Sequence, residues 1–126
     1  MRIEKGVIIV AYKVSRRNRR YLVLNRTKNW EGWELPKGHL EESYMETVKM
    51  ELEEEAGIST GDIQEVEDLE RTVKWSYEDD GEKVKREYRA YLVEVSDDAY
   101  VDTDSNPHDE HEKGFFFDLD DASSLL

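Results

Sequence analysis

One segment, residues 43–57, constrains the fold more than any other, because it carries a start signal, a stop signal and two distinct faces of a helix. Ser43, with Glu46 three residues later, matches an N-terminal capping box. Gly57 is the residue type that most often ends a helix, since it adopts the left-handed conformation without steric cost. We therefore predict a helix from Ser43 to Ala56, with an apolar stripe formed by Met45, Val48, Leu52 and Ala56.

The other side of this helix is acidic. At about 100° per residue, Glu51, Glu54 and Glu55 share one face, and Tyr44 and Thr47 lie on the same side. Like charges at this spacing destabilise a helix by about 0.2–0.5 kcal/mol per pair. A hard divalent cation such as Mg²⁺, which takes oxygen ligands, compensates that repulsion. The spacing therefore predicts a face that gathers divalent ions.

Strand patterns flank the helix on both sides. The Arg-rich stretch Arg16–Arg20 and the sequence Asp79-Asp80-Gly81 predict hairpin turns between neighbouring strands. The order strands, helix, strands, helix predicts one α/β domain over residues 1–126, with a mixed β-sheet sandwiched between helices (α/β/α). The predicted strands cover residues 7–12, 21–24, 64–77, 83–95 and 115–117.

Three further segments carry weaker expectations. Residues 30–39, with two glycines and a proline, predict a loop. Residues 96–112 are polar and rich in Asp, and predict a long, mobile loop. The three phenylalanines at 115–117 are expected to be buried, and Asp118 is expected to cap a short final helix.

Composition narrows the functional classes. The chain of 126 residues has a formal net charge of −13 and no Cys, which excludes thiolate chemistry and a disulfide framework. Because extended nucleic-acid binding needs a basic surface, that class is disfavoured, and a small phosphorylated ligand held through metal ions remains compatible. With no membrane-spanning stretch or signal peptide in the sequence, we expect a cytoplasmic protein without membrane contact.

Two stretches together resemble the signature of the Nudix hydrolases. That signature is a glycine, a glutamate, and then Arg-Glu-apolar-x-Glu-Glu-x-Gly-apolar. Here Gly38 opens the pattern within residues 35–42, Glu42 is the loop glutamate, and residues 51–58 supply the second half without a gap. The resemblance implies a Nudix-like fold.

The chain departs from this signature in two places. Three residues separate Gly38 from Glu42, where the family has five. The arginine of the signature falls on Met50, which cannot pair with acidic groups, and Lys49 lies about 100° away around the helix. Both departures leave the expected metal ligands in place and bear on the rate.

The resemblance implies Mg²⁺- or Mn²⁺-dependent hydrolysis of a nucleoside diphosphate linked to another group, through attack of water on phosphorus. It implies metal binding by Glu51, Glu54, Glu55 and the Gly38 carbonyl. Glu54 is the expected general base, with Glu110 as a second candidate. Since pyrophosphate and the helix face are both negative, divalent cations between them make their approach favourable.

Within the family, the sequence from Trp33 to His39 and the later Glu110-His111 are most similar to the diadenosine tetraphosphate hydrolases. This similarity implies that Lys37 and His39 contact phosphate. Tyr88 or Tyr91 is a candidate for stacking an adenine, and ordinary sheet packing is the alternative for both.

Other interpretations stay open from the sequence. The ligand on the same scaffold can be a capped or triphosphorylated RNA 5′ end, an inositol pyrophosphate or a nucleotide sugar. Met50 and the short loop also fit a Nudix-fold sensor that binds a nucleotide without turnover. The oligomeric state is not predicted.

Overall fold

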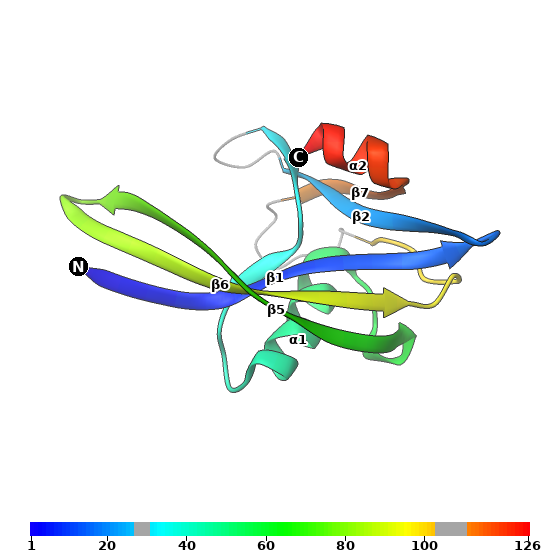
Figure 1. Ribbon diagram of the computed structural model, residues 1–126, viewed down its shortest axis with the longest axis horizontal. Coiled ribbons are helices and arrows are strands. Elements are labelled where there is room, and N and C mark those ends of the chain that lie inside the picture. Colours follow the sequence, from blue (N-terminus) through cyan, green and yellow to red (C-terminus); the bar gives the residue numbers. More distant parts are fainter. Residues whose placement is uncertain (27–30, 103–110) are drawn as a thin grey trace.

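The computed structural model describes residues 1–26, 31–102 and 111–126, the last range without the side chains of 111–113. Seven strands, two α-helices and one 3₁₀ turn follow one another along this part of the chain (Figure 1). In order they are β1 (Arg2–Ser15), β2 (Asn18–Arg26), β3 (Gly32–Glu34), β4 (Lys37–His39), α1 (Tyr44–Ala56), a 3₁₀ turn (Thr60–Asp62), β5 (Ile63–Asp79), β6 (Glu82–Val95), β7 (His111–Phe117) and α2 (Leu119–Leu125).

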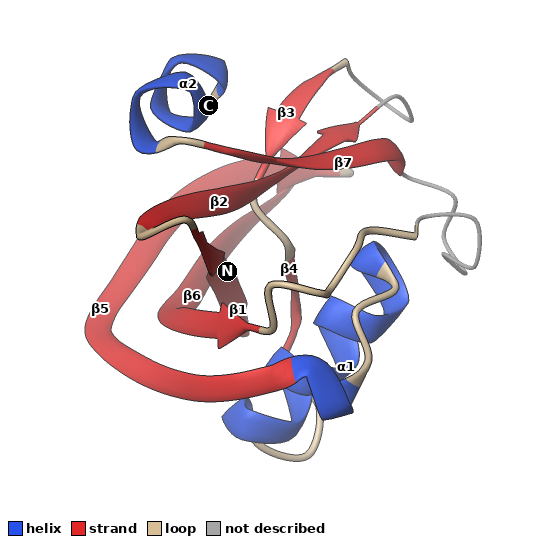
Figure 2. Cartoon of the chain, turned by 90° about the vertical axis from the view of Figure 1, so that its right-hand side faces the viewer, coloured by secondary structure: helices blue, strands red, loops and turns tan. Residues whose placement is uncertain are grey.

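The strands form one mixed sheet in the order β3-β2-β1-β6-β5, with β4 added to β1 and β7 added to β2. Strands β1 and β6 run parallel, from the pair Arg2↔Val84 to the pair Tyr12↔Glu94, and the other pairings are antiparallel. Helix α1 packs on β1 and β4, whereas α2 packs on β2, β3 and β7. The helices therefore lie on opposite sides of the sheet (Figure 2), which confirms the predicted α/β class.

The hydrophobic core lies between α1 and the sheet. Alternate residues of β1 and β6 point to the same face, as the twofold period of a strand requires, and meet one face of α1. Burial of such side chains contributes about 1.5–3 kcal/mol each, which fixes the helix against the strands. The fully buried members include Val7, Ile9, Ala11, Leu22, Leu24, Val48, Leu52, Ala56 and Val93.

Helix α1 begins and ends where the sequence predicts. Ser43 Oγ accepts a hydrogen bond from Glu46 N at 3.1 Å, and Gly57 has the left-handed φ of 68°. The predicted apolar stripe is wrong at one position, because Met45 is 41% exposed. Tyr44, expected on the acidic side, packs on the core instead, with its ring 6.3 Å from that of Tyr91. The buried stripe thus follows i, i+4 spacing back to Tyr44 rather than Met45.

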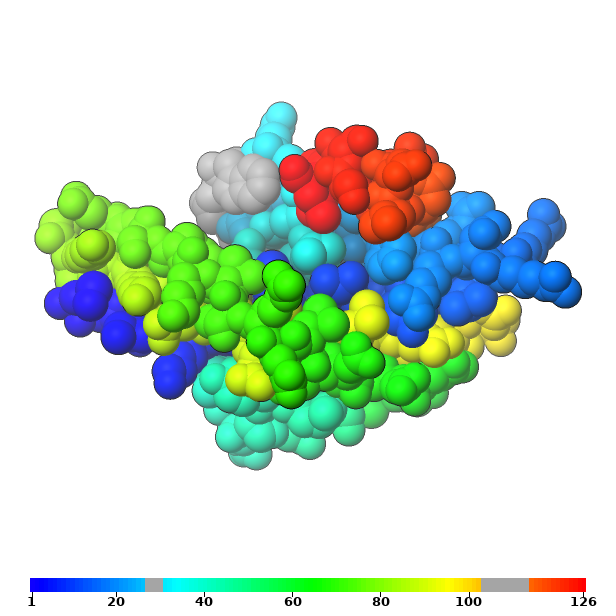
Figure 3. Space-filling view, viewed as in Figure 1, coloured from blue at the N-terminus to red at the C-terminus, as the bar shows by residue number. Residues whose placement is uncertain are grey.

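Both predicted hairpins are confirmed. Arg16 and Arg17 form the first turn with positive φ values of 52° and 70°, and Asp80 and Gly81 form the second with 54° and 82°. Strands β5 and β6 continue far past the core and, with the start of β1, form an arm at one end of the molecule (Figure 3).

The segments with weaker expectations have mixed outcomes. Within 30–39 the loop prediction is wrong for β3 and β4, because their extended form depends on pairing with distant strands, which local composition does not show. Of the predicted loop 96–112, residues 103–110 lie outside the described residues, and β7 already begins at His111. Residues 115–117 are in a strand as predicted, but the expected burial is wrong. Phe115 is 47% exposed, and Phe116 and Phe117 are only half-buried, because β7 lies at the sheet edge. Asp118 caps α2 by accepting a hydrogen bond from Asp121 N at 2.9 Å.

In the described ranges, no helix has the length and apolarity needed to cross a membrane.

Candidate active site

Strand β4 and helix α1 bring a glycine and two carboxylates into contact. The Glu51 carboxyl group lies so close to Gly38 that a Cβ atom there would overlap it. Beside it, Lys37 N donates a hydrogen bond of 3.2 Å to Glu55 Oε2. Glu51 is 8% exposed and Glu55 is 6% exposed, so both carboxylates are enclosed between helix and strand. Gly38 is therefore required sterically for the acidic face to approach β4.

The loop between β4 and α1 is held by Thr47. This fully buried side chain accepts a hydrogen bond from Glu41 N at 2.9 Å and donates one to Ser43 O at 2.7 Å. Because Thr47 lies one helical turn before Glu51, it fastens the shortened loop on the same side as the carboxylates.

A cleft of about 450 Å³ opens beside these residues. It brings together most of the residues that the sequence predicts as a site. Glu42 lines a neighbouring depression with Lys49 instead, and Glu110 lies outside the described residues. The predicted residues that line the cleft are Lys37, Gly38, His39, Glu51, Glu54, Glu55 and Tyr88.

Cationic side chains also line the cleft, and among them Lys37 is expected from the sequence to contact phosphate. Glu34, 8% exposed, pairs with Arg26 Nη1 at 3.2 Å and with Lys37 Nζ at 2.6 Å. A carboxylate shared by two cations holds both ammonium and guanidinium groups at the cleft. The sequence does not predict the pairing of Arg26 with Glu34, since that pairing depends on β2 meeting β3.

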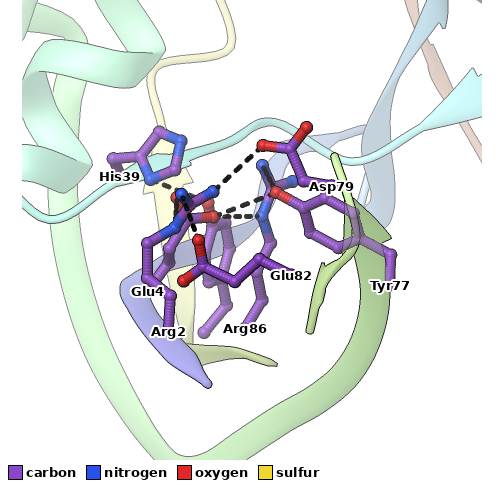
Figure 4. A network of polar contacts seen from close by, with 8 residues as sticks. Arg2, Glu4, His39, Tyr77, Asp79, Glu82 and Arg86 are labelled. Atoms are coloured by element: carbon purple, nitrogen blue, oxygen red, sulfur yellow. Dashed lines mark hydrogen bonds and ion pairs between the residues drawn. The ribbon is translucent and has the colours of Figure 1, made fainter. Parts of the chain in front are cut away.

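Arg86 reaches the cleft from β6. Its Nε donates to Glu4 Oε1 at 3.0 Å, and its Nη2 donates to the Tyr77 hydroxyl at 3.2 Å. Figure 4 shows these three side chains turned toward one another, with Arg2 and Asp79 beyond them. The hydrogen bond from Arg86 is the main cause that lowers the pKa of Glu4, so this carboxylate stays charged.

Tyr88 lies deep beside His39. A Cβ on Gly6 would overlap the Gly38 carbonyl oxygen and would come within 2.7 Å of the Tyr88 ring, so Gly6 makes room for both. The Tyr88 hydroxyl is 3.5 Å from His39 Nδ1, and its ring meets Trp75 edge-on at 5.0 Å. Burial raises the pKa of the Tyr88 phenol to about 12.

The two candidate stacking tyrosines lie on opposite faces of β6. Tyr91 is 5% exposed within the hydrophobic core and does not line the cleft, so the structure contradicts a stacking role for it. Tyr88 is 2% exposed, which leaves little ring face for a base and favours packing against Trp75 and His39. Residues an odd number apart along a strand face opposite ways, which explains the difference.

The donor set fits a hard divalent cation in chemistry. Glu51, Glu54, Glu55 and the Gly38 carbonyl offer only oxygen atoms, the ligands that Mg²⁺ and Mn²⁺ prefer. Within the described ranges, no three acidic or histidine side chains are gathered closely enough to hold an ion as they stand. Glu55 points to Lys37 N, and the Gly38 carbonyl oxygen lies against Gly6. Ligation of one ion by all three carboxylates therefore requires rotation of their side chains.

The fold and the cleft define an α/β protein with a cleft that is lined by the carboxylates of one helix and by basic side chains from the sheet. The chain belongs to the NUDIX domain family, whose family model matches residues 4–126.

Solved structures share the fold at low identity. Ap4A hydrolase from C. elegans in a binary complex is 21% identical, with a TM-score of 0.74 over 97% of this chain and 85% of that chain. Dihydroneopterin triphosphate pyrophosphohydrolase from E. coli is 17% identical, with a TM-score of 0.74 over 100% and 89%. The NUDIX domain of Shewanella oneidensis NrtR, complexed with ADP ribose, is 18% identical, with a TM-score of 0.73 over 100% and 79%.

These likenesses establish the fold, and the ligand must be inferred from the cleft itself. A search of curated protein sequences gave no match. Membership of the family, with hydrolases among the structural neighbours, supports the prediction of a pyrophosphohydrolase.

Proposed function

We propose that the protein is a divalent-metal-dependent pyrophosphohydrolase of dinucleoside polyphosphates such as diadenosine tetraphosphate. The observation that carries this proposal is one cleft lined by both carboxylates and cationic side chains. Glu51, Glu54 and Glu55 line it from α1, and Arg26, Lys37 and Arg86 line it from the strands. A chain of phosphates needs cations on both sides, which basic side chains supply on one wall and divalent ions supply on the acidic wall.

The acidic wall would hold the ions. Glu51, Glu54, Glu55 and the Gly38 carbonyl are the proposed ligands of Mg²⁺ or Mn²⁺. When bound, such ions neutralise phosphoryl oxygens and lower the pKa of attacking water.

Glu54 is the proposed general base. It makes no hydrogen bond or ion pair with any residue that the structure describes, whereas Glu55 is bonded to Lys37 N. A carboxylate without a competing donor is available to take the proton of water. Glu110 is kept as the second candidate, although it lies outside the described residues.

The basic wall would bind and orient the substrate. Lys37 and Arg86 would donate hydrogen bonds to phosphate oxygens. His39, the last residue of β4, would donate another. The motif from Trp33 to His39 and the fold shared with a C. elegans Ap4A hydrolase favour a dinucleoside polyphosphate. A cytoplasmic location is part of this proposal.

A sensor without turnover is the second candidate. Met50 lines the cleft at the position of the signature arginine, and a NUDIX domain complexed with ADP ribose shares the fold. This alternative retains the ligand cleft and loses only the chemistry.

The test is incubation with diadenosine tetraphosphate and Mg²⁺ or Mn²⁺, followed by separation of the products. Release of ATP and AMP supports the proposal. Capped RNA, an inositol pyrophosphate, a nucleotide sugar and ADP ribose are run in parallel, and faster turnover of one of these would reassign the substrate. Tight binding of a nucleotide with no turnover of any substrate would favour the sensor.

A further inference from the structure

Arg86 lies in the middle strand of the arm, between two strands that each place a partner beside it. In the sheet register Glu4 of β1 is directly opposite Arg86 on one side, and Trp75 of β5 is opposite it on the other. Tyr77 is two residues past Trp75, so its side chain lies on the same face as that of Trp75. The three side chains of Glu4, Tyr77 and Arg86 consequently meet over one face of the arm (Figure 4).

The contacts form a closed triangle. Arg86 donates to Glu4 at 3.0 Å and to the Tyr77 hydroxyl at 3.2 Å, and that hydroxyl is itself 3.3 Å from the same Glu4 oxygen, Oε1. Arg2 Nε lies 3.5 Å from the other oxygen of Glu4, so the carboxylate is held from two sides. Because a guanidinium is planar and its donors are fixed in a fork, two bonds on one edge fix the direction of the other edge.

The third guanidinium nitrogen of Arg86, Nη1, is available to a ligand. Nε and Nη2 are bonded to Glu4 and Tyr77, and Nη1 makes no hydrogen bond with any residue in the described ranges. Arg86 and Glu51 both line the cleft, whereas Glu4 and Tyr77 do not. Glu4 and Tyr77 therefore direct a hydrogen bond to a ligand only by way of Arg86.

We propose that Glu4 and Tyr77 are positioning residues, which hold the Arg86 guanidinium so that Nη1 donates to an oxygen of a bound polyphosphate. The proposal rests on the proposed function for its substrate. It adds that the strength of polyphosphate binding is set from outside the cleft, by the first strand and the β5–β6 arm.

The sign of the effect separates positioning from charge. Glu4→Gln removes a negative charge near the cleft, and charge alone predicts tighter binding of an anion. Positioning predicts weaker binding, because the amide no longer holds the guanidinium with a charge-assisted bond. The matched control is Glu87→Gln, which removes the same charge from the adjacent residue on the opposite face, where Glu87 pairs with Lys74 and Lys85.

The experiment measures two quantities for each purified full-length variant. One is KM and kcat for diadenosine tetraphosphate, and the other is the Kd for inorganic tripolyphosphate with Mg²⁺, measured by calorimetry. For Glu4→Gln we expect KM and Kd to rise about tenfold, which corresponds to one charge-assisted hydrogen bond, with kcat within about twofold. Tyr77→Phe should raise both by about threefold, as expected for a neutral donor–acceptor pair. Glu87→Gln should leave both unchanged or slightly lower.

A double variant makes the test specific. In the Arg86→Gln background, Glu4→Gln should not raise KM or Kd further, because the guanidinium that Glu4 holds is absent. Additive effects, tighter binding in Glu4→Gln, or an equal effect of Glu87→Gln would each overturn the proposal.

The two proposals fail in different ways. If no substrate is turned over but tripolyphosphate binding still weakens about tenfold in Glu4→Gln, the positioning role stands and the hydrolase is rejected. If turnover is found and Glu4→Gln leaves KM and Kd unchanged, the hydrolase stands and the positioning role is rejected. Wild-type protein that does not bind tripolyphosphate would also reject the positioning role.

Discussion

The wall of the cleft formed by β4 and α1 differs from the wall formed by β1, β5 and β6 in how far along the chain its contacts reach. On the first wall, Lys37 and Glu55 are 18 residues apart. On the second, Glu4 and Arg86 are 82 residues apart. The local wall can be recognised in the sequence as a motif, because a turn and a helix fix its geometry. The distant wall exists only once the parallel pairing of β1 and β6 has formed.

The walls also differ in their chemistry. The local wall collects the α1 carboxylates, which repel one another, beside Lys37, whereas the distant wall presents Arg86, which is held by the carboxylate of Glu4. Substitutions on the first wall should therefore change the chemical step, and substitutions on the second should change binding. Four predictions test or sharpen this contrast.

The largest effect is expected for Glu54→Gln on the local wall. Loss of the general base should lower kcat by about 10²–10⁴-fold, with the melting temperature unchanged because Glu54 makes no bond to a described residue. Steady-state kinetics and thermal denaturation measure the two quantities. Glu53→Gln, at the exposed neighbouring position, is the matched control and should leave kcat unchanged. Full activity in Glu54→Gln would remove Glu54 as the base and direct attention to Glu110.

Gly6→Ala should disturb both walls at once. The added methyl would overlap the Gly38 carbonyl oxygen and crowd the Tyr88 ring, so we expect a loss of about 1–3 kcal/mol in the free energy of unfolding. Chemical denaturation measures that loss. Gly61→Ala is the control, because its nearest neighbour would be Ser59 Oγ at 3.8 Å, which is ordinary contact. Equal stability of the two variants would show that the walls are not in contact at Gly6.

Met50→Arg tests whether the departure from the family signature limits the rate. A guanidinium at this position on the cleft can pair with the helix carboxylates, and we expect kcat/KM to rise by about 2- to 10-fold, the value of one hydrogen bond. The measurement is turnover of diadenosine tetraphosphate. Lys49→Arg, which changes the adjacent depression, is the control. No change in Met50→Arg would mean that other cationic side chains of the cleft already replace the signature arginine.

The last prediction concerns the pH dependence of stability. Folding raises the pKa of Tyr88 from 10.0 to about 12, so its contribution to the free energy of unfolding is complete below pH 10 and is lost as the pH rises toward 12. Tyr88→Phe should therefore make the decline of stability over this range shallower, as measured by denaturation at several pH values. Tyr100→Phe, at a residue that is 76% exposed, should leave the slope unchanged.

Much of the fold was predictable because its signals are local. The capping residue Ser43, the stop at Gly57 and the turn at Asp80-Gly81 each act within a few residues, and each is confirmed. Strands β3 and β4 were missed because three residues in each are extended only through pairing with β2 and β1. The exposure of Met45 and the burial of Tyr44 depend on how α1 is rotated against the sheet, which helical spacing alone leaves open.

Half of the candidate site was predictable in the same sense. Gly38 and the three glutamates of α1 were expected together, and they line one cleft. Their roles as ligands and base stay predictions. The alternation of β6 could have excluded Tyr91 from the site. Tyr91 is two and four residues before Val93 and Val95, so it shares the core face of the strand with them. The same alternation places Arg86 on the face of β6 that carries Tyr88, so it also predicts Arg86 at the site.

By itself, the sequence determined one helix with an acidic face, the glycine loop before it and the hairpins on either side, because dihedral preferences and capping act over single turns of chain. The tertiary structure decided which cations oppose that face, since Arg86 and Glu4 meet only across strands that pair after the chain has closed on itself. It also decided that Gly6 must lack a side chain, because the groups it would strike belong to Gly38 and Tyr88.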